Sequence, residues 1–231
     1  MVDKTTSCEE TVPLINVVQW VSRSVVNGPG ERFVLWVQGC PFRCPGCINP
    51  SFLTFEEKHL MSVEAIAERV LAVEGIEGIT YSGGEPMAQA PGLYHLTRRL
   101  KAAGLTAVSY SGYTLQELQN HSDPYVPLLL GQLDLLIDGR YVAQQSGQLP
   151  WRGSNNQEVH LLSPAYSHLA ATAQTAHREV EFIVGENQFT STGIFDSKLV
   201  RRLEEMLRES PDQISQDLRA LDRLINQGET P

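Results

Sequence analysis

The sequence predicts an α/β fold built on a mainly parallel sheet. Three observations predict it: strand-like and helix-like segments alternate from about Phe33 onward, turns rich in glycine and proline separate them, and polar loops follow several strands. Such alternation is typical of parallel sheets with right-handed crossovers. In these sheets the functional loops gather beyond the carboxyl ends of the strands. We therefore expect the functional site in loops of that kind.

The first half of the chain predicts strands and helices in alternation. Residues 14–26 are apolar and rich in β-branched side chains, which favours extended structure, and a breaker-rich turn follows them. Residues 33–37 form a continuous apolar run, as expected of a strand buried on both faces. A helix is expected to begin after Ser62, a good N-cap residue. The next expected elements are a strand at 78–82 and a helix at 92–103 that ends at Gly104.

The second half continues the pattern and then changes character. Thr114 is expected to cap a short helix, and further strands are expected at 105–110, 133–138, 159–162 and 180–184. After about Asp196, apolar residues recur at helical spacing and Pro211 interrupts them, which predicts two amphipathic helices. Covering a flank of the sheet is the favoured role for these helices, and docking a partner is the alternative. We expect one domain over residues 14–195 and a helical extension over residues 196–231.

Composition restricts the class of protein and its partners. The chain has 231 residues, 42% of them hydrophobic, and a formal net charge of −9 without any long basic run. This balance disfavours nucleic acid as a partner. No apolar run reaches the length of a membrane span, and the polar N-terminus lacks the apolar core of a signal peptide. We therefore expect a cytoplasmic protein without a membrane partner.

Three cysteines fall within eight residues, at Cys40, Cys44 and Cys47. A cubane iron–sulfur cluster normally takes four thiolates, so three thiolates leave one iron without a protein ligand. An open metal position is where a substrate or cofactor binds in catalytic sites. The spacing therefore indicates a reactive cluster. The fourth cysteine, Cys8, is expected to be a free thiol, and the alternative is a fourth ligand that closes the site. A zinc site that uses His59 is disfavoured, because structural zinc sites usually bring paired Cys-x2-Cys ligands.

The cysteines belong to a longer pattern that resembles a known family. The run 28–39 leads directly into them, and the strand at 78–82 ends at Gly83-Gly84-Glu85-Pro86. This order resembles the radical S-adenosylmethionine (radical SAM) activating enzymes. Segments 111–113, 133–140 and 151–157 are similar to the branch that activates anaerobic ribonucleotide reductase. The resemblance covers roughly Val17 to Leu162, and the stretch after Ser163 is additional.

The resemblance implies a fold, two cofactors and a reaction. The fold would be a partial (β/α) barrel over residues 14–195, and the cofactors a [4Fe–4S] cluster and SAM. Cys40, Cys44 and Cys47 would each hold one iron, and SAM would chelate the fourth through its amino and carboxylate groups. Reductive cleavage of SAM would then generate a glycyl radical on a partner such as anaerobic ribonucleotide reductase, with flavodoxin or ferredoxin as the reductant. Two alternatives stay open: another peptide or small-molecule substrate, and a non-catalytic iron–sulfur module.

The resemblance also implies which residues contact SAM. They are, in chain order, Gly46, Cys47, Ile48, Gly83, Gly84, Glu85 and Ser111. Glycines without side chains let a ligand approach the backbone closely, and Gly83 and Gly84 would bond the methionine amino group. Glu85 would add polarity there or brace the loop. Ser111 would line the ribose or cation region, and a strand-to-helix turn is an equally good explanation of that position.

One further polar residue and two polar segments are weaker candidates for a functional role. Asp138 ends an apolar strand, and its favoured role is to cap the neighbouring turn rather than to bind cofactor atoms. The turn-rich segments 151–154 and 155–157 are candidates for the surface that receives a partner's glycine loop. The residue before Cys47 is Gly46 rather than an aromatic residue, so the sequence does not say what packs against the adenine of SAM.

Substitution of Cys8 distinguishes the open cluster from the closed one. If three thiolates hold the cluster, Cys8→Ala keeps the same iron and sulfide content per chain after anaerobic reconstitution. Iron and acid-labile sulfide analysis measures this. A variant that loses its cluster would support the four-ligand binding module instead.

Overall fold

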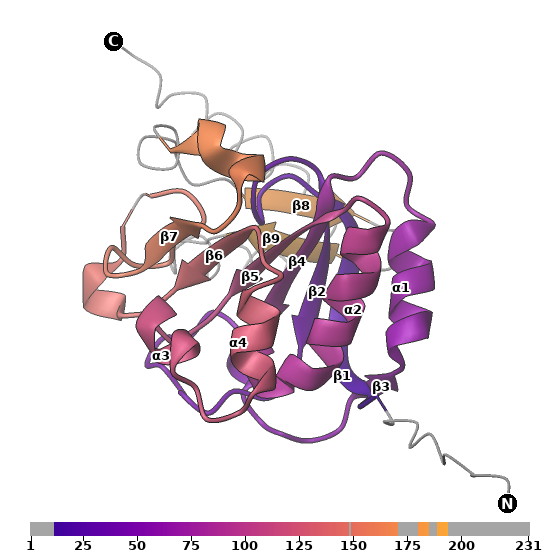
Figure 1. Ribbon diagram of the computed structural model, residues 1–231. Coiled ribbons are helices and arrows are strands. Elements are labelled where there is room, and N and C mark those ends of the chain that lie inside the picture. Colours follow the sequence, from indigo (N-terminus) through magenta and orange to yellow (C-terminus); the bar gives the residue numbers. More distant parts are fainter. Residues whose placement is uncertain (1–11, 148, 171–179, 185–188, 194–231) are drawn as a thin grey trace, which may run out of the picture. The chain divides into compact units, whose positions relative to one another are not determined.

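A computed structural model describes residues 12–147, 149–170, 180–184 and 189–193 (Figure 1). The chain divides into two compact units, Met1–Ile194 and Phe195–Pro231. The second unit lies outside the described residues, and so do Cys8 and the two helices expected after Asp196. No helix among the described residues has the length and apolar character needed to cross a membrane.

A seven-stranded sheet carries the described fold, in the order β3-β1-β2-β4-β5-β6-β7. Its strands are β1 (Ile15–Ser24), β2 (Arg32–Val37), β3 (His59–Met61), β4 (Gly78–Gly83), β5 (Thr106–Tyr110), β6 (Leu135–Asp138) and β7 (Glu158–Leu161). The central strands β2, β4, β5 and β6 are parallel, which confirms the expected parallel sheet at its centre. The flanks differ, because β1, β3 and β7 pair antiparallel with their neighbours. The connections β1–β2 and β6–β7 carry no α-helical crossover of the kind that a parallel return requires.

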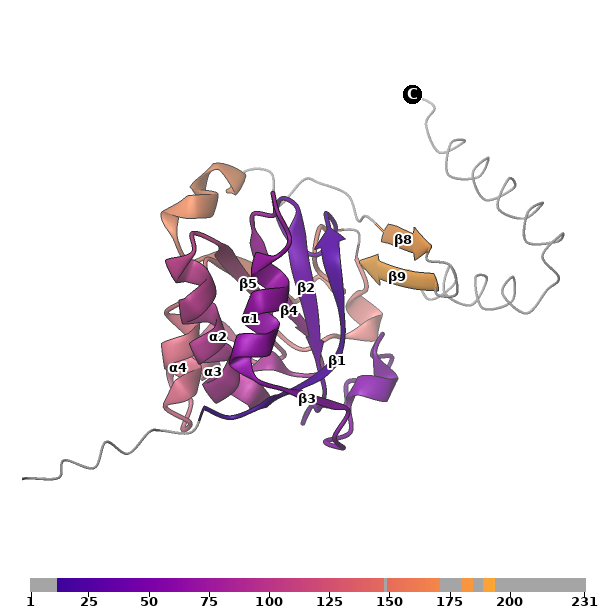
Figure 2. The same cartoon turned by 90° about the vertical axis from the view of Figure 1, so that its right-hand side faces the viewer.

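The α-helices α1 (Val63–Leu71), α2 (Ala90–Ala102), α3 (Leu115–Gln119) and α4 (Tyr125–Leu130) lie on one side of this sheet (Figure 2). Short 3₁₀ helices fill the connections: η1 (Pro50–Phe52), η2 (Pro86–Gln89), η3 (Ala143–Gln145) and η4 (Pro164–Leu169). The sequence did not predict α4, which contains Pro127. That proline lies in the first helical turn, where its missing N–H has no intrahelical partner to lose.

The expected helix ends are confirmed where a local side chain or a glycine defines them. The Ser62 side chain accepts a hydrogen bond from the Ala65 N–H at the start of α1. Thr114 and Glu117 form a reciprocal capping box at the start of α3. At the end of α2, Gly104 takes a left-handed backbone with φ of 88°. There the Gly104 N–H donates to Lys101 O and the Leu105 N–H to Leu100 O, which is the Schellman arrangement.

The central strands β2 and β6 are buried on both faces of the sheet. On the helix side, Phe33, Leu35 and Val37 of β2 join the larger core cluster with residues of α1 and α2. A smaller cluster on β5 and β6 gathers around Tyr166 of η4 and includes Val108. Because every residue of β2 is buried, the strand needs the continuous apolar run that the sequence shows at 33–37.

Arg32 is the charged member of this buried strand and has no exposed surface. Its guanidinium donates to the backbone oxygens of Pro29, Ile79 and Thr106 and to the side chains of Thr80, Thr106 and Tyr166. Burial lowers the pKa of this guanidinium, and the neighbouring Tyr166 opposes the shift. The cation therefore ties the amino ends of three central strands to η4.

A second, two-stranded sheet pairs β8 (Val180–Val184) with β9 (Phe189–Gly193) in antiparallel fashion. The strand expected at 180–184 is therefore confirmed, but it belongs to a separate hairpin. The buried Asn27 side chain donates to the Thr192 hydroxyl at 2.6 Å and to the Ser24 hydroxyl at 2.8 Å. This contact joins the hairpin to the turn between β1 and β2.

Tyr166→Phe tests the contribution of this buried network. The substitution removes one acceptor from Arg32 and the bond from Tyr166 to the Thr106 hydroxyl. We expect the free energy of unfolding to fall by about 1.5–3 kcal/mol, because hydrogen bonds to a charged group lie in that range. Urea denaturation of both proteins measures the difference. An unchanged unfolding midpoint would show that the network does not stabilise the fold.

Candidate active site

Two loops leave neighbouring strands at the carboxyl edge of the sheet. The cysteine loop (residues 40–47) follows β2, and the glycine loop (residues 83–86) begins at the last residue of β4. The two strands pair in parallel register up to the pair Val37 and Gly83. The loops therefore start from the same rung of the sheet and lie next to each other. This is the edge at which sheets of this kind place their chemistry.

The glycine loop packs against the backbone that enters the cysteine loop. The Gly84 N–H donates to Val37 O and the Glu85 N–H to Gly39 O, both at 2.8 Å. A Cβ at Gly83 would lie 2.6 Å from the Val37 backbone, and one at Gly84 would lie 2.3 Å from Gly39 O. Close approach of two backbones thus accounts for both glycines. Their contact with SAM stays a prediction.

Glu85 is buried and braces the loops. Its carboxylate accepts hydrogen bonds from the Met87 N–H at 2.9 Å, the Ser111 hydroxyl at 3.0 Å and the Gly112 N–H at 2.7 Å. Only 1% of the residue is exposed. Burial raises the pKa of this carboxyl to about 7, although all three donors act against the rise. Of the two roles expected for Glu85, the internal brace is the one its contacts display.

Ser111 is buried at the end of β5 and serves the same brace. Its hydroxyl donates to Glu85 and accepts from the Tyr113 N–H at 3.1 Å. These two bonds agree with the strand-to-helix turn that the sequence allowed at this position. The expected contact of Ser111 with SAM stays a prediction.

Phe42 clamps the cysteine loop onto the loops that follow β5 and β6. Its ring packs edge-on against Tyr113, with the ring centroids 4.6 Å apart, and the Arg140 guanidinium lies 4.4 Å from its centroid. A Cβ at Gly112 would lie 2.4 Å from a ring atom of Phe42. The sequence did not indicate these contacts of Phe42. An apolar side chain within an otherwise turn-rich loop is the signal that could have indicated them.

The loop backbone is wound through several left-handed positions. Gly39 has φ of 94° and Gly46 has φ of 77°, conformations in which glycine carries no steric penalty. Arg43 has φ of 49°, which is uncommon for a residue with a side chain and is typical of functional sites. Gly46 faces Tyr141 and Ala143, and Ile48 is 48% exposed. The expected SAM contacts of Gly46, Cys47 and Ile48 stay predictions.

The cysteine thiols are reduced and partly buried. Burial raises the pKa of Cys40 and Cys47, and the neighbouring Cys44 raises both further. Backbone N–H groups act in the opposite direction, from Phe42 and Arg43 on Cys40 and from Asn49 on Cys47. Hydrogen bonds to sulfur are one of the means by which proteins tune iron–sulfur clusters.

The donor set fits a multi-iron cluster better than a single ion. Among the residues that the structure describes, no three His, Cys, Asp or Glu side chains lie close enough to hold one metal ion. The expectation against a zinc site that uses His59 stays a prediction. A cubane cluster binds each thiolate at a different iron, so its cysteines need not converge on one point. Three thiols close in sequence, two of them with backbone N–H donors to their sulfurs, suit such a cluster.

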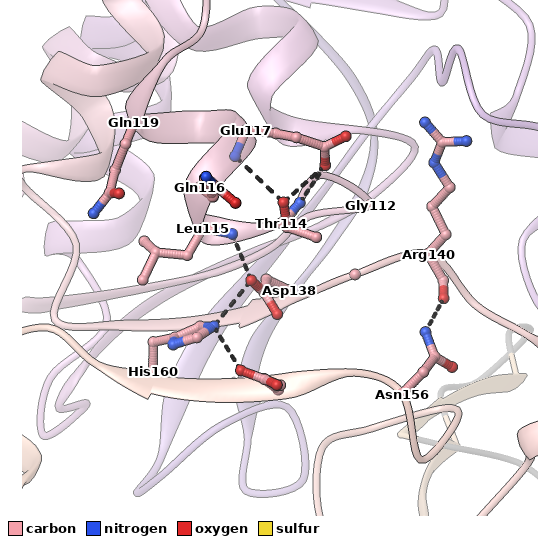
Figure 3. A pocket seen from close by; sticks show the side chains of 12 residues that line it. Gly112, Thr114, Leu115, Gln116, Glu117, Gln119, Asp138, Arg140, Asn156 and His160 are labelled. Carbon is pink, nitrogen blue, oxygen red and sulfur yellow. Dashed lines mark hydrogen bonds and ion pairs between the residues drawn. The ribbon is translucent and has the colours of Figure 1, made fainter.

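A pocket of about 720 Å³ lies beside the loops after β5 and β6 (Figure 3). It is lined by Gly112, Thr114, Leu115, Gln116, Glu117, Gln119, Asp138, Gly139, Arg140, Asn156, Glu158 and His160. Asp138 accepts from the Leu115 N–H at 2.5 Å, and His160 Nε2 lies 2.9 Å from the same carboxylate oxygen. The Asp138 carboxylate thus caps α3, in agreement with the favoured structural role.

The segment 151–157 folds back on the loop that follows β6. The Gln157 side chain accepts from the backbone N–H groups of Gly153 and Ser154 and donates to Gly139 O. The Asn156 side chain donates to Arg140 O at 2.8 Å. These bonds fix the backbone at Arg140, whose guanidinium lies over the Phe42 ring. Reception of a partner's glycine loop by this segment stays a prediction.

The family model described as a 4Fe-4S single cluster domain matches residues 26–160. The chain belongs to this iron–sulfur family, and the matched region contains the cysteine loop, the glycine loop and the loop after β5.

Relatives within that class include several proteins that share one name. The anaerobic ribonucleoside-triphosphate reductase-activating protein of Vibrio cholerae is 32% identical over 155 residues, which are 63% of this chain and 97% of that protein. The Escherichia coli K12 protein of the same name is 32% identical over 64% of this chain and 99% of its own length. The phage T4 protein of that name is 30% identical over 58% of this chain and 86% of its own length.

Among solved structures, the crystal structure of QueE from Escherichia coli gives a TM-score of 0.32. That likeness has 22% identity and covers 44% of this chain and 53% of the other. A similarity of this extent carries no functional argument.

Glu85→Gln is expected to change how stability depends on pH. Because burial raises the pKa of Glu85 from 4.5 to about 7, the folded state binds its proton more tightly than the unfolded state. The contribution of Glu85 to stability is therefore fully present below pH 4.5 and decreases as the pH rises to about 7. The linked change is at most about 3 kcal/mol.

Denaturant unfolding of wild type and variant across this pH range measures the effect. The difference in unfolding free energy, wild type minus Glu85→Gln, should fall with rising pH. A difference that is constant or increases would contradict the buried, proton-binding carboxyl.

Proposed function

We propose that this protein is a radical SAM activating enzyme. It cleaves S-adenosylmethionine reductively and generates a glycyl radical on an anaerobic ribonucleoside-triphosphate reductase. One observation carries the proposal: similarity to the activating proteins extends over 97% of the Vibrio cholerae relative. A shared cysteine loop alone would support the cofactor, whereas similarity along the whole relative also supports the kind of partner. This favours the activase over a radical SAM enzyme with another substrate.

The residues at the carboxyl edge of the sheet have separate roles in cluster ligation, SAM binding and orientation. Cys40, Cys44 and Cys47 would hold three irons of a [4Fe–4S] cluster and leave the fourth to SAM. The backbone at 46–48 and 83–85 would bind SAM, with Ser111 at its border. The cofactors, when bound, would supply the radical chemistry: one electron would reduce SAM to methionine and a 5′-deoxyadenosyl radical, which would take a hydrogen atom from a partner glycine. The chain itself orients these groups through the contacts of Phe42, Glu85 and Gly112.

The proposal includes the fold of the protein, its electron donor and its location in the cell. A one-sided layer of helices and four parallel central strands support a partial (β/α) barrel over residues 14–195 (Figure 2). The proposed extension over residues 196–231 would follow it in the chain. A flavodoxin or ferredoxin supplies the electron that SAM cleavage consumes. The protein acts in the cytoplasm, where thiols stay reduced.

Anaerobic reconstitution tests the function. The full-length protein is loaded with iron and sulfide and mixed with SAM, dithionite and the large subunit of an anaerobic reductase. We expect 5′-deoxyadenosine by chromatography and a glycyl radical by EPR. Cys44→Ala should produce neither, and Cys8→Ala should produce both.

The two readouts separate the parts of the proposal. A loaded cluster that yields no 5′-deoxyadenosine would overturn radical SAM chemistry. Formation of 5′-deoxyadenosine without a glycyl radical on the reductase would retain the chemistry and overturn the partner.

A further inference from the structure

We propose that residues 111–113, the loop after β5, act as a bracket that fixes the glycine loop relative to the cysteine loop. Glu85 and Phe42 are the positioning residues at its two ends. The inference rests on the proposed function, because it states what sets the SAM-binding loop in register with the cluster-binding loop. It assigns both side chains an orienting role rather than contact with the reacting atoms.

Glu85 holds the first end of the bracket. Its carboxylate accepts two of its three hydrogen bonds from the bracket, one from the Ser111 hydroxyl at 3.0 Å and one from the Gly112 N–H at 2.7 Å. The third comes from Met87, in η2, which begins within the glycine loop. The carboxylate therefore spans the carboxyl ends of β4 and β5. A glutamine could not replace it, because its NH₂ group would face a backbone N–H of Gly112 or Met87 whichever way the amide turns.

Phe42 holds the second end. Its ring occupies the space where a Gly112 side chain would begin, 2.4 Å from the position of that Cβ. The ring also packs edge-on against Tyr113. Phe42 lies between the first two cysteines, so the position of its ring fixes the middle of the cysteine loop.

Gly112 contacts both ends and therefore couples them. Its N–H bonds the Glu85 carboxylate, and its α-carbon faces the Phe42 ring. Close-packed contacts of this kind pass a displacement on instead of absorbing it. A shift of the glycine loop would move Gly112, and with it the cysteine loop.

Asp134 offers a matched control at the opposite edge of the sheet. It is 3% exposed and accepts from the Ala107 N–H, the Ser163 hydroxyl and Lys101. It precedes β6, at the amino edge, and touches neither loop. A buried carboxylate with only a structural role should behave like Asp134.

The first test uses the metal-free protein and does not depend on catalysis. Gly112 does not have a left-handed backbone, so an alanine there is strained only by its neighbours. We expect Gly112→Ala to lower the urea unfolding midpoint strongly in the protein that retains Phe42. The same substitution should lower the midpoint only slightly in the Phe42→Ala variant. Equal losses in both backgrounds would overturn the clamp, whatever the protein's activity.

The second test compares Glu85→Gln with Asp134→Asn in reconstituted protein. SAM is titrated against the EPR spectrum of the reduced cluster. We expect Glu85→Gln to retain its iron content and bind SAM about tenfold more weakly, the loss expected for one hydrogen bond to a charged group. Asp134→Asn should lower the unfolding midpoint and leave SAM affinity unchanged.

The outcomes separate the bracket from the proposed function. Wild-type SAM affinity in Glu85→Gln, or equal weakening in Asp134→Asn, would overturn the positioning role. If wild type fails to cleave SAM while the Gly112–Phe42 coupling is present, the proposed function fails and the clamp stands.

Discussion

The site depends on the parallel pairing of β2 with β4. That pairing runs without a break from Arg32 and Gly78 to Val37 and Gly83. Because the strands end at the same level, the loops that follow them begin side by side, and two backbone hydrogen bonds from the glycine loop extend the contact beyond the sheet. Only glycine allows this approach, since a Cβ at Gly84 would meet Gly39 O. The glycines thus belong to the construction of the site whatever they bind.

The amino edge and the carboxyl edge of the sheet have different roles. At the amino edge, Arg32 and Asp134 are buried and bonded to strand ends, and Arg32 also anchors η4. At the carboxyl edge, the cysteine loop has a non-glycine residue with positive φ, Arg43, and partly buried thiols, and the exposed apolar side chain of Ile48 follows it. Separation of this kind lets one edge stabilise the fold while the other accepts strain.

The sequence predicted what local chemistry determines. Ser62, Thr114 and Gly104 were read correctly because each acts on a helix end within a few residues of itself. The apolar run of β2 was equally clear. The antiparallel flanks were not predicted, because the period of side chains along a strand is the same for either direction of pairing.

The site was predictable in part. The cysteines and the glycine loop are short motifs, and the sequence placed both after strands. The contact of Phe42 with Gly112 joins residues 42 and 112, which are distant in sequence, so no local pattern contains it. The sequence left two roles open for Glu85, a brace of the loop and a polar contact. Burial of its side chain distinguishes them, and burial is a property of the folded chain. Arg140 was named within a similar segment, but its position over Phe42 comes from the bonds of residues 156 and 157.

The raised pKa values of Cys40 and Cys47 have a consequence for how the protein acquires its iron. Metals bind thiolates, so cluster assembly on this loop releases protons from these two partly buried thiols. Acidic conditions therefore oppose the assembly, and burial of Cys40 and Cys47 adds to that opposition.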